Sequence, residues 1–377
     1  FALLGEDSIE GKAVRVTASR DVAVYGLTHI DYSTDTFLGI PVELLGNEYI
    51  AIGYKNVWSE IPVLNGSQFA IAAPYHDTVI EIDPSTKTAT RPSGDPFTIV
   101  LNRGETFQLR SVEDAPSDLT GTIIRSNRPI AVFGGHQCAN IRGTQFFCDQ
   151  IVEQLLPVTA WGTRYNTVPL RTRTKDTIRV VASRNGTPVM VNGAMVTMLN
   201  RGGIFEFVAD QPTQVLSEYP IMVAQYSNSS DYDMVEDSDP FMVMAQPAST
   251  YLNNYRFYAP PTSGFDKNFI NVVVPVGEAG VVTLDGTAIN AIPGAVGNPF
   301  PVGGLEGWQV PLSGAGVGHI LIGGKSAVGL TIYGFASYDF DSYGNSGGMR
   351  LRDTQPPIVA CPEYVAVYGT LQDPKSG

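Results

Sequence analysis

Cysteine and histidine, the side chains that most often build metal centres and activated nucleophiles, are scarce in this chain. Only 3 cysteines and 4 histidines occur among 377 residues. No histidine stands in an HExxH motif or in another paired metal-ligand spacing. A GxSxG nucleophile elbow is absent, and no lysine follows the glycine-rich stretch 314–318 in the position that a phosphate-binding loop requires. The sequence therefore predicts a protein that is not an enzyme.

Positive charge and long apolar runs are missing as well. The chain has 24 Lys and Arg against 37 Asp and Glu, a formal charge of −13. Nucleic acids and anionic membrane surfaces both require a basic face, so neither is an expected partner. No apolar run approaches the roughly 20 residues of a membrane-spanning helix, so we expect no membrane insertion. The N-terminus lacks the basic flank and apolar core of a signal peptide, which indicates the mature or excised part of a longer protein.

What the chain has instead is turn residues and alternating apolar strands. It contains 39 glycines and 26 prolines, and β-branched and aromatic residues alternate along most of its length. This composition is typical of an all-β protein with many turns. A helical period appears only in residues 149–156 (DQIVEQLL), the one helix that the sequence predicts.

One block of residue types recurs three times, and each copy has a tyrosine eight positions after a proline. The copies occupy 40–54, 156–170 and 246–260, with the pairs Pro41 and Tyr49, Pro157 and Tyr165, and Pro247 and Tyr255. An apolar strand precedes each block, and a hairpin-like segment and a glycine followed by an aromatic strand come after it. Repeats about 100 residues apart are whole small β-domains rather than solenoid turns.

We therefore expect concatenated β-sandwich-like modules, about three repeats after an N-terminal partial unit. The predicted segments are 1–65 (a partial unit packing on the first module), 66–170, 171–262, 263–350, and 351–377 (a linker and the start of a further module).

Two cysteines lie ten positions apart, in the loop that follows the second apolar strand. Cys138 and Cys148 could form a disulfide, remain thiols or supply half of a zinc site, for which His136 is near but a fourth ligand is not apparent. The disulfide is favoured because the composition is that of a secreted protein.

Three glycosylation sequons fall in predicted turns, at Asn65, Asn185 and Asn228. Asn185 is followed by glycine and is equally well explained as a tight hairpin turn.

Acidic clusters follow the third and fourth apolar strands, at 231–239 and 339–342. Alternating oxygen side chains on a loop can bind Ca²⁺, and Asp231, Asp233, Asp237 and Asp239 are the candidate ligands. Solvated acidic loops are the alternative explanation in so acidic a chain. No other cofactor is expected.

Long stretches at 14–54, 126–138 and 148–165 (CDQIVEQLLPVTAWGTRY) resemble the IgGFc-binding protein N-terminal domain family. The resemblance covers roughly residues 10–345 and implies a secreted, non-enzymatic surface or matrix protein with Cys138 and Cys148 disulfide-bonded. Residues 353–362 (DTQPPIVACP) are similar to the start of a hyalin-repeat (HYR) immunoglobulin-like module, which implies that Cys361 pairs beyond residue 377.

The sequence thus predicts an extracellular or cell-surface structural or adhesive protein, part of a filament, sheath or matrix. Its expected partners are other extracellular proteins, further copies of itself and glycans, for which tyrosine-rich segments could provide a stacking surface. The alternative is a specific binding module, an adhesin or receptor domain that recognises a glycan or an immunoglobulin.

Overall fold

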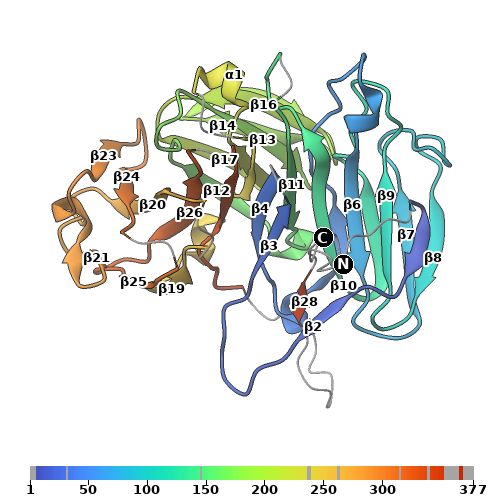
Figure 1. Cartoon of the computed structure of the whole chain (residues 1–377), viewed down its shortest axis with the longest axis horizontal. Coiled ribbons are helices and arrows are strands. Elements are labelled where there is room, and N and C mark those ends of the chain that lie inside the picture. The colour runs from blue at the N-terminus through green and yellow to red at the C-terminus, as the bar shows by residue number, and fades with distance from the viewer. Residues whose placement is uncertain are drawn as a thin grey trace. The chain divides into compact units, whose positions relative to one another are not determined.

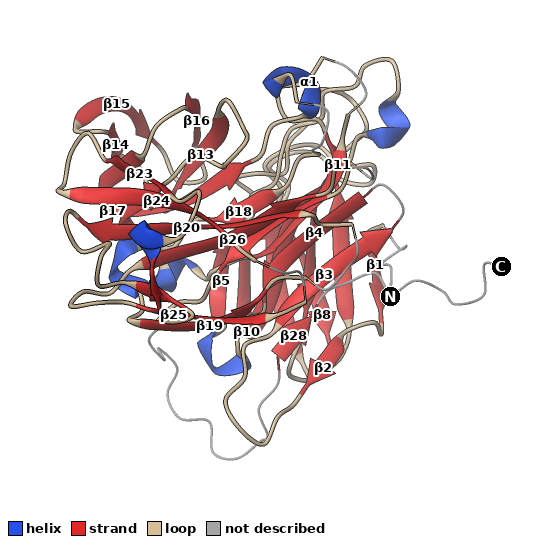
Figure 2. Ribbon diagram, turned by 60° about the vertical axis from the view of Figure 1, so that its left-hand side comes forward, coloured by secondary structure: helices blue, strands red, loops and turns tan. Residues whose placement is uncertain are grey.

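The computed structural model describes residues 6–30, 33–144, 147–235, 239–260, 264–313, 316–337, 340–351 and 365–367. Regular structure in these residues is almost entirely β-strand, drawn in red in Figure 2. The prediction of an all-β fold built from sandwich-like modules is confirmed. The helices are single turns: η1 (Val42–Leu44), η2 (Pro62–Leu64), η3 (Val158–Ala160), α1 (Ser230–Asp233), η4 (Ala248–Thr250) and η5 (Ile289–Ala291).

The chain divides into two compact units. The first comprises Phe1–Asn140, Cys148–Trp161 and Leu351–Gly377, and the second comprises Ile141–Phe147 and Gly162–Arg350. The second unit contains both of the segments that the sequence predicts as separate modules, 171–262 and 263–350.

Module 1, in the first unit, shows the plan that the other modules repeat. Its strands are β5 (Gly46–Ile50), β6 (Ser67–Ala72), β7 (Thr78–Asp83), β8 (Phe97–Leu101), β9 (Thr106–Arg110), β10 (Ile123–Ala139) and β11 (Asp149–Gln154). The central strand β6 pairs antiparallel with β9 and with the second half of the long strand β10, which also pairs with β11. The first half of β10 pairs with β7 and β5. β8 adds to β7, and these two strands lie side by side in Figure 1. One long strand therefore contributes to two sheets, as at the corners of β-sandwiches.

The remaining strands of this unit come from the chain ends. They are β1 (Ser8–Glu10), β2 (Val14–Val16), β3 (Tyr25–Ile30), β4 (Ser33–Leu38) and β28 (Val365–Val367). β1 pairs with β9, β3 with β4, and β2 with β28. Hydrogen bonds join β4 to module 1, because the Asp35 carboxylate accepts from Val152 N (2.9 Å) and the Asp149 carboxylate accepts from Thr34 N (3.2 Å).

Module 2 repeats the plan in the second unit. Its strands are β12 (Gly162–Thr167), β13 (Asp176–Ala182), β14 (Thr187–Val191), β15 (Ala194–Leu199), β16 (Ile204–Ala209), β17 (Thr213–Tyr226) and β18 (Met242–Met244). The central strand β13 pairs with β16 and with the second half of β17, while the first half of β17 pairs with β14 and β12.

Module 3 follows the same order, with the long strand split in two. Its strands are β19 (Asn254–Tyr258), β20 (Lys267–Pro275), β21 (Thr283–Leu284), β22 (Thr287–Ala288), β23 (Val296–Pro299), β24 (Leu305–Pro311), β25 (Gly318–Ile322), β26 (Gly329–Phe335) and β27 (Ser342–Ser346). β20 pairs with β24 and β26, and β25 pairs with β19 and β21.

The predicted helix over 149–156 is wrong, because residues 149–154 form β11. Ile151 and Val152 are β-branched and fit a pleated strand, and Ile151 pairs with His136 of β10. Tertiary pairing with a long buried strand overrides the helical spacing of Ile151, Val152, Leu155 and Leu156.

The recurring proline-to-tyrosine block is a structural corner. In module 2, Pro157 precedes the turn η3, and β12 then leads to the buried Tyr165. The Tyr165 hydroxyl accepts from Gly162 N (3.0 Å) and donates to Ile221 O (2.6 Å), at the point where β17 passes from one sheet to the other. The equivalent bonds are Gly46 N to Tyr49 to Ile130 O, and Leu252 N to Tyr255 to Val328 O.

Each block strand pairs with the long strand that follows it in the sequence. β12 and β19 lie before the predicted boundaries at 171 and 263, yet they pair with β17 and β25 beyond those boundaries. A module of the folded chain therefore takes one strand from the segment that precedes it.

Candidate functional site

Equivalent loops carry most of the residues that the sequence singles out. In every module the long strand ends in a loop that leads to a strand pairing beside it, namely β10 to β11, β17 to β18 and β26 to β27. The cysteine pair flanks the first of these loops, and the acidic clusters occupy the second and third. These loops therefore hold most of the candidate site residues.

The first loop is closed covalently. Cys138 and Cys148 form a disulfide with a Cα–Cα distance of 5.1 Å, between the end of β10 and the start of β11. Nearby His136 is buried; its Nε2 lies 3.0 Å from Asn56 Oδ1, and its Nδ1 accepts from Cys138 N (3.0 Å). His136 is thus held within the fold by hydrogen bonds.

The aspartates predicted to bind calcium, where the structure describes them, have different partners. The Asp231 carboxylate accepts from Thr144 N (2.6 Å) and Thr144 Oγ1 (3.1 Å). Asp233 accepts from Thr174 Oγ1 (2.5 Å), and burial raises its pKa. Asp237 lies outside the described residues. Within the part of the chain that the structure describes, no three His, Cys, Asp or Glu side chains are grouped as metal ligands.

Asp239 has a different neighbour, the carboxylate of Asp341 from the equivalent loop of module 3. The two residues are only 5% and 6% exposed. Burial, and then the negative charge of Asp341, raise the pKa of Asp239 well above its ordinary range. The sequence places both loops after equivalent strands, but only the fold brings these two carboxylates together.

Asp176 is a buried acid that the sequence analysis missed. Its carboxylate accepts from Leu170 N (2.9 Å) and Gln225 Nε2 (2.7 Å) at the start of β13. Burial raises its pKa to about 7, although both hydrogen bonds act in the opposite direction. A single aspartate at a strand start carries no sequence signal for such burial.

An open cavity of about 610 Å³ lies in the second unit, where the 169–174 connection meets β23. Two arginines border it, and Arg171 Nη1 also donates to Gly294 O (2.6 Å). Thr172 stands in a left-handed conformation with φ 67°. The lining of the cavity is mainly polar and exposed: Pro169, Leu170, Arg171, Thr172, Arg173, Thr174, Asp210, Gln211, Pro212, Val296, Asn298, Pro299 and Gln309. A cavity of this size fits a small ligand or an extended side chain.

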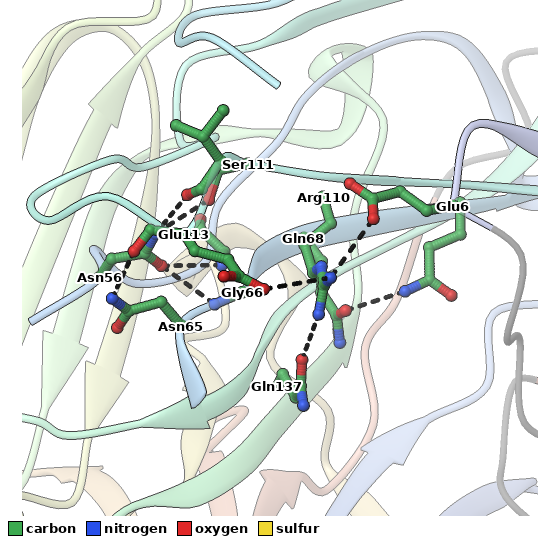
Figure 3. A network of polar contacts seen from close by, with 12 residues as sticks. Glu6, Asn56, Asn65, Gly66, Gln68, Arg110, Ser111, Glu113 and Gln137 are labelled. Carbon is green, nitrogen blue, oxygen red and sulfur yellow. Dashed lines mark hydrogen bonds and ion pairs between the residues drawn. The ribbon is translucent and has the colours of Figure 1, made fainter. Parts of the chain in front are cut away.

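Two of the three sequon asparagines are buried in hydrogen-bond networks. The Asn65 amide nitrogen donates to Trp58 O (2.5 Å) and Glu113 O (2.6 Å), within the network around Asn56 shown in Figure 3. The Asn228 amide nitrogen donates to Lys175 O (2.6 Å). Both residues are 0% exposed, so the folded chain has no room for a glycan on either nitrogen. Asn185 is exposed in the turn between β13 and β14.

Figure 3 also shows a second set of polar contacts beside the Asn56 network. Arg110 Nη1 donates to Gln137 Oε1 (2.6 Å), and Arg110 Nη2 lies 3.3 Å from Glu6 Oε2. The Asn56 amide oxygen accepts from Gly66 N and Ser67 N (both 3.1 Å), and its nitrogen donates to Val112 O (2.7 Å). These contacts hold connecting segments in module 1.

No helix among the described residues is long and apolar enough to cross a membrane.

Comparison with known proteins gives a consistent result. The family model described as IgGFc binding protein matches residues 35–334. A human protein named IgGFc-binding protein is 24% identical over 288 residues, a stretch that covers 74% of this chain and 5% of the human protein. The chain therefore spans a small part of that relative's length.

Proposed function

Because the chain belongs to the IgGFc-binding protein family, we propose that it is an extracellular, non-enzymatic protein that presents and spaces surfaces in a cell-surface or matrix assembly. The observation that carries this proposal is the repetition of one β-module plan with the same tyrosine corner in each copy. Repeated modules supply regularly spaced surfaces, and the deeply buried corners make each module stiff.

Contacts between modules 2 and 3 support a spacing role. The 168–171 connection is held by Asn271 Nδ2, which donates to Val168 O (2.8 Å) and Pro169 O (3.0 Å). Arg171 N donates to the Tyr333 hydroxyl (2.9 Å). Side chains from both modules share one core cluster: Leu170, Phe241, Val243, Phe269, Tyr333 and Phe335. Such a joint transmits force instead of bending.

The edge strand β15 supports self-association. It pairs with β14 on one side, and Met195 and Met198 are each 60% exposed. An exposed apolar edge strand is a template for pairing with another chain, and natural monomers usually protect such edges. We propose that a second copy of this chain covers it.

The test is electron microscopy of the protein purified without denaturant from its native source. We expect fibres or a layer with this chain at a fixed repeat distance.

The purified chain should also sediment as oligomers, and Met195→Lys with Met198→Lys should return it to single particles. A matched control is Val79→Lys with Val100→Lys, on the equivalent hairpin β7–β8, where these valines are 39% and 48% exposed. Dispersed particles in the native preparation would contradict the assembly role.

A specific binding module is the second candidate, and the 610 Å³ cavity favours it. Arginines in an acidic protein select ligands that carry a carboxylate or another anionic group, such as acidic glycans. Saturable binding to a glycan array or to immunoglobulin Fc, lost on Arg171→Ala and kept on the exposed control Arg128→Ala, would support this function. A lack of saturable binding would leave the assembly role as the better explanation.

A further inference from the structure

We propose that Asp239 and Asp341 form a divalent-cation site, suited to Ca²⁺, between the acidic loops of modules 2 and 3. This pair differs from the set of four aspartates that the sequence suggests. Asp231 and Asp233 are instead held by hydrogen bonds from Thr144 and Thr174.

Local structure brings the two carboxylates together. Asp239 comes three residues before β18, and Asp341 comes immediately before β27. β18 and β27 pack against each other, and the Ser342 hydroxyl donates to the carbonyl oxygen of Asp239 (2.5 Å). Strand packing and this hydrogen bond hold Asp239 next to Ser342, the residue that follows Asp341.

The Asp239 carboxylate lacks the protein partners that buried acids normally have. Among the residues that the structure describes, none donates a hydrogen bond to its Oδ1 atom. Water does not readily replace such a partner, because the residue is only 5% exposed. The charged group that does act on it, Asp341, has the same sign and raises the pKa of Asp239.

A buried Asp239 carboxylate beside another negative charge is costly unless something positive joins it. An unpaired buried carboxylate costs several kcal/mol even after the protein relaxes. A doubly charged cation removes the repulsion and provides a partner for the carboxylate oxygens. Ca²⁺ accepts carboxylate, carbonyl and water oxygens in a flexible shell, whereas Mg²⁺ demands a near-ideal octahedron.

One proton shared by the two carboxyls is the competing explanation, and substitution separates the two. Asparagine preserves the shape of aspartate and removes its charge. If the two carboxyls share a proton, the substitution should stabilise the fold and calcium should have no effect. If they bind a cation, the substitution should weaken calcium binding.

The experiment titrates Ca²⁺ into the whole chain after removal of metal with a chelator, using isothermal calorimetry and thermal unfolding at pH 7.5. We expect one Ca²⁺ per chain with a Kd on the order of 10⁻⁴ to 10⁻³ M, as in extracellular calcium modules, and weaker binding of Mg²⁺. Asp239→Asn and Asp341→Asn should each weaken binding by about ten-fold or more and remove the calcium-induced rise in Tm. Asp231→Asn, in the same acidic loop, is the matched control and should bind as the wild type does.

Two results would overturn the proposal. The first is no heat and no rise in Tm up to 10 mM Ca²⁺, together with an Asp239→Asn protein that is more stable than the wild type; this would assign a shared proton to the pair. The second is calcium binding that survives both substitutions, which would place the cation elsewhere.

Discussion

The loop after β10 and the loops after β17 and β26 stand at equivalent places in the fold but are held in different ways. The first is closed by the Cys138–Cys148 disulfide. The other two bring Asp239 and Asp341 together inside the second unit. A covalent closure acts whatever the ions in solution, whereas a carboxylate pair responds to whatever positive charge is present. The same arrangement of strands thus allows either a disulfide or a carboxylate pair at this position, because the neighbouring strands stabilise the fold.

Removing the disulfide should give the largest effect. Cys138→Ser with Cys148→Ser frees a loop of ten residues, and chain entropy predicts a loss of about 2–3 kcal/mol in the free energy of unfolding. Urea unfolding measures it, with the reduced wild type as a second control. Added Ca²⁺ should not restore the loss. A double variant as stable as the oxidised protein would show that the surrounding strands alone hold this loop.

Breaking the corner that all modules share tests whether they are equivalent. Tyr165→Phe removes one hydroxyl and leaves a partly buried N–H and a buried carbonyl without that partner, which costs about 1–3 kcal/mol. We expect similar losses for Tyr49→Phe and Tyr255→Phe, measured by urea unfolding. The exposed Tyr258→Phe, whose hydroxyl bonds to Gly316 O, is the control and should change stability less. Unequal losses among the three corner tyrosines would mean that one corner is dispensable.

The buried acid Asp176 should make stability depend on pH. Its pKa is raised to about 7, so between pH 4 and 7 the folded state keeps a proton that the unfolded chain releases. This contribution is complete below pH 4 and is lost as the pH rises to about 7. Asp176→Asn should therefore show a smaller decline over this range, followed by urea unfolding at several pH values. Parallel pH curves for the two proteins would contradict the raised pKa.

Glycosylation should have the smallest effect on stability. When the chain is secreted from eukaryotic cells, we expect a glycan at Asn185 and none at Asn65 or Asn228, because these two are buried. Mass spectrometry before and after enzymatic deglycosylation measures this. Asn185→Gln should remove the mass shift and change the free energy of unfolding by no more than about 0.5 kcal/mol. Glycans on Asn65 would require this part of module 1 to fold differently.

Much of the architecture could be predicted from the sequence because it is repeated in the sequence. Alternating apolar residues, turn glycines and the three blocks indicated β-modules and their approximate number. The prediction for 149–156 failed because pairing with β10 outweighed local spacing. The predicted limits of the modules did not show that a module takes one strand from the preceding segment. β12 and β19 do this when they pair with strands of later segments. Their order in the sequence gives no sign of this.

The candidate sites were less predictable for a related reason. A sequon or an acidic run in the sequence shows which residue types are present, but burial in the fold determines which of them are accessible to solvent. Asn65 and Asn228 match the glycosylation pattern and yet lie in hydrogen-bond networks. Asp176 belongs to no predicted site, and Asp341 lies in an acidic cluster but was not named as a ligand. Both acquire unusual environments only through the fold.

The sequence by itself determined the β-class, the repetition and the family, because alternation, turn residues and recurring blocks are local properties that survive as a pattern of letters. Tertiary structure alone decided which strand completes which module, which asparagine faces solvent and which two carboxylates meet. Those outcomes depend on contacts between residues about a hundred positions apart, such as Asp239 and Asp341, and on the loss of water around them.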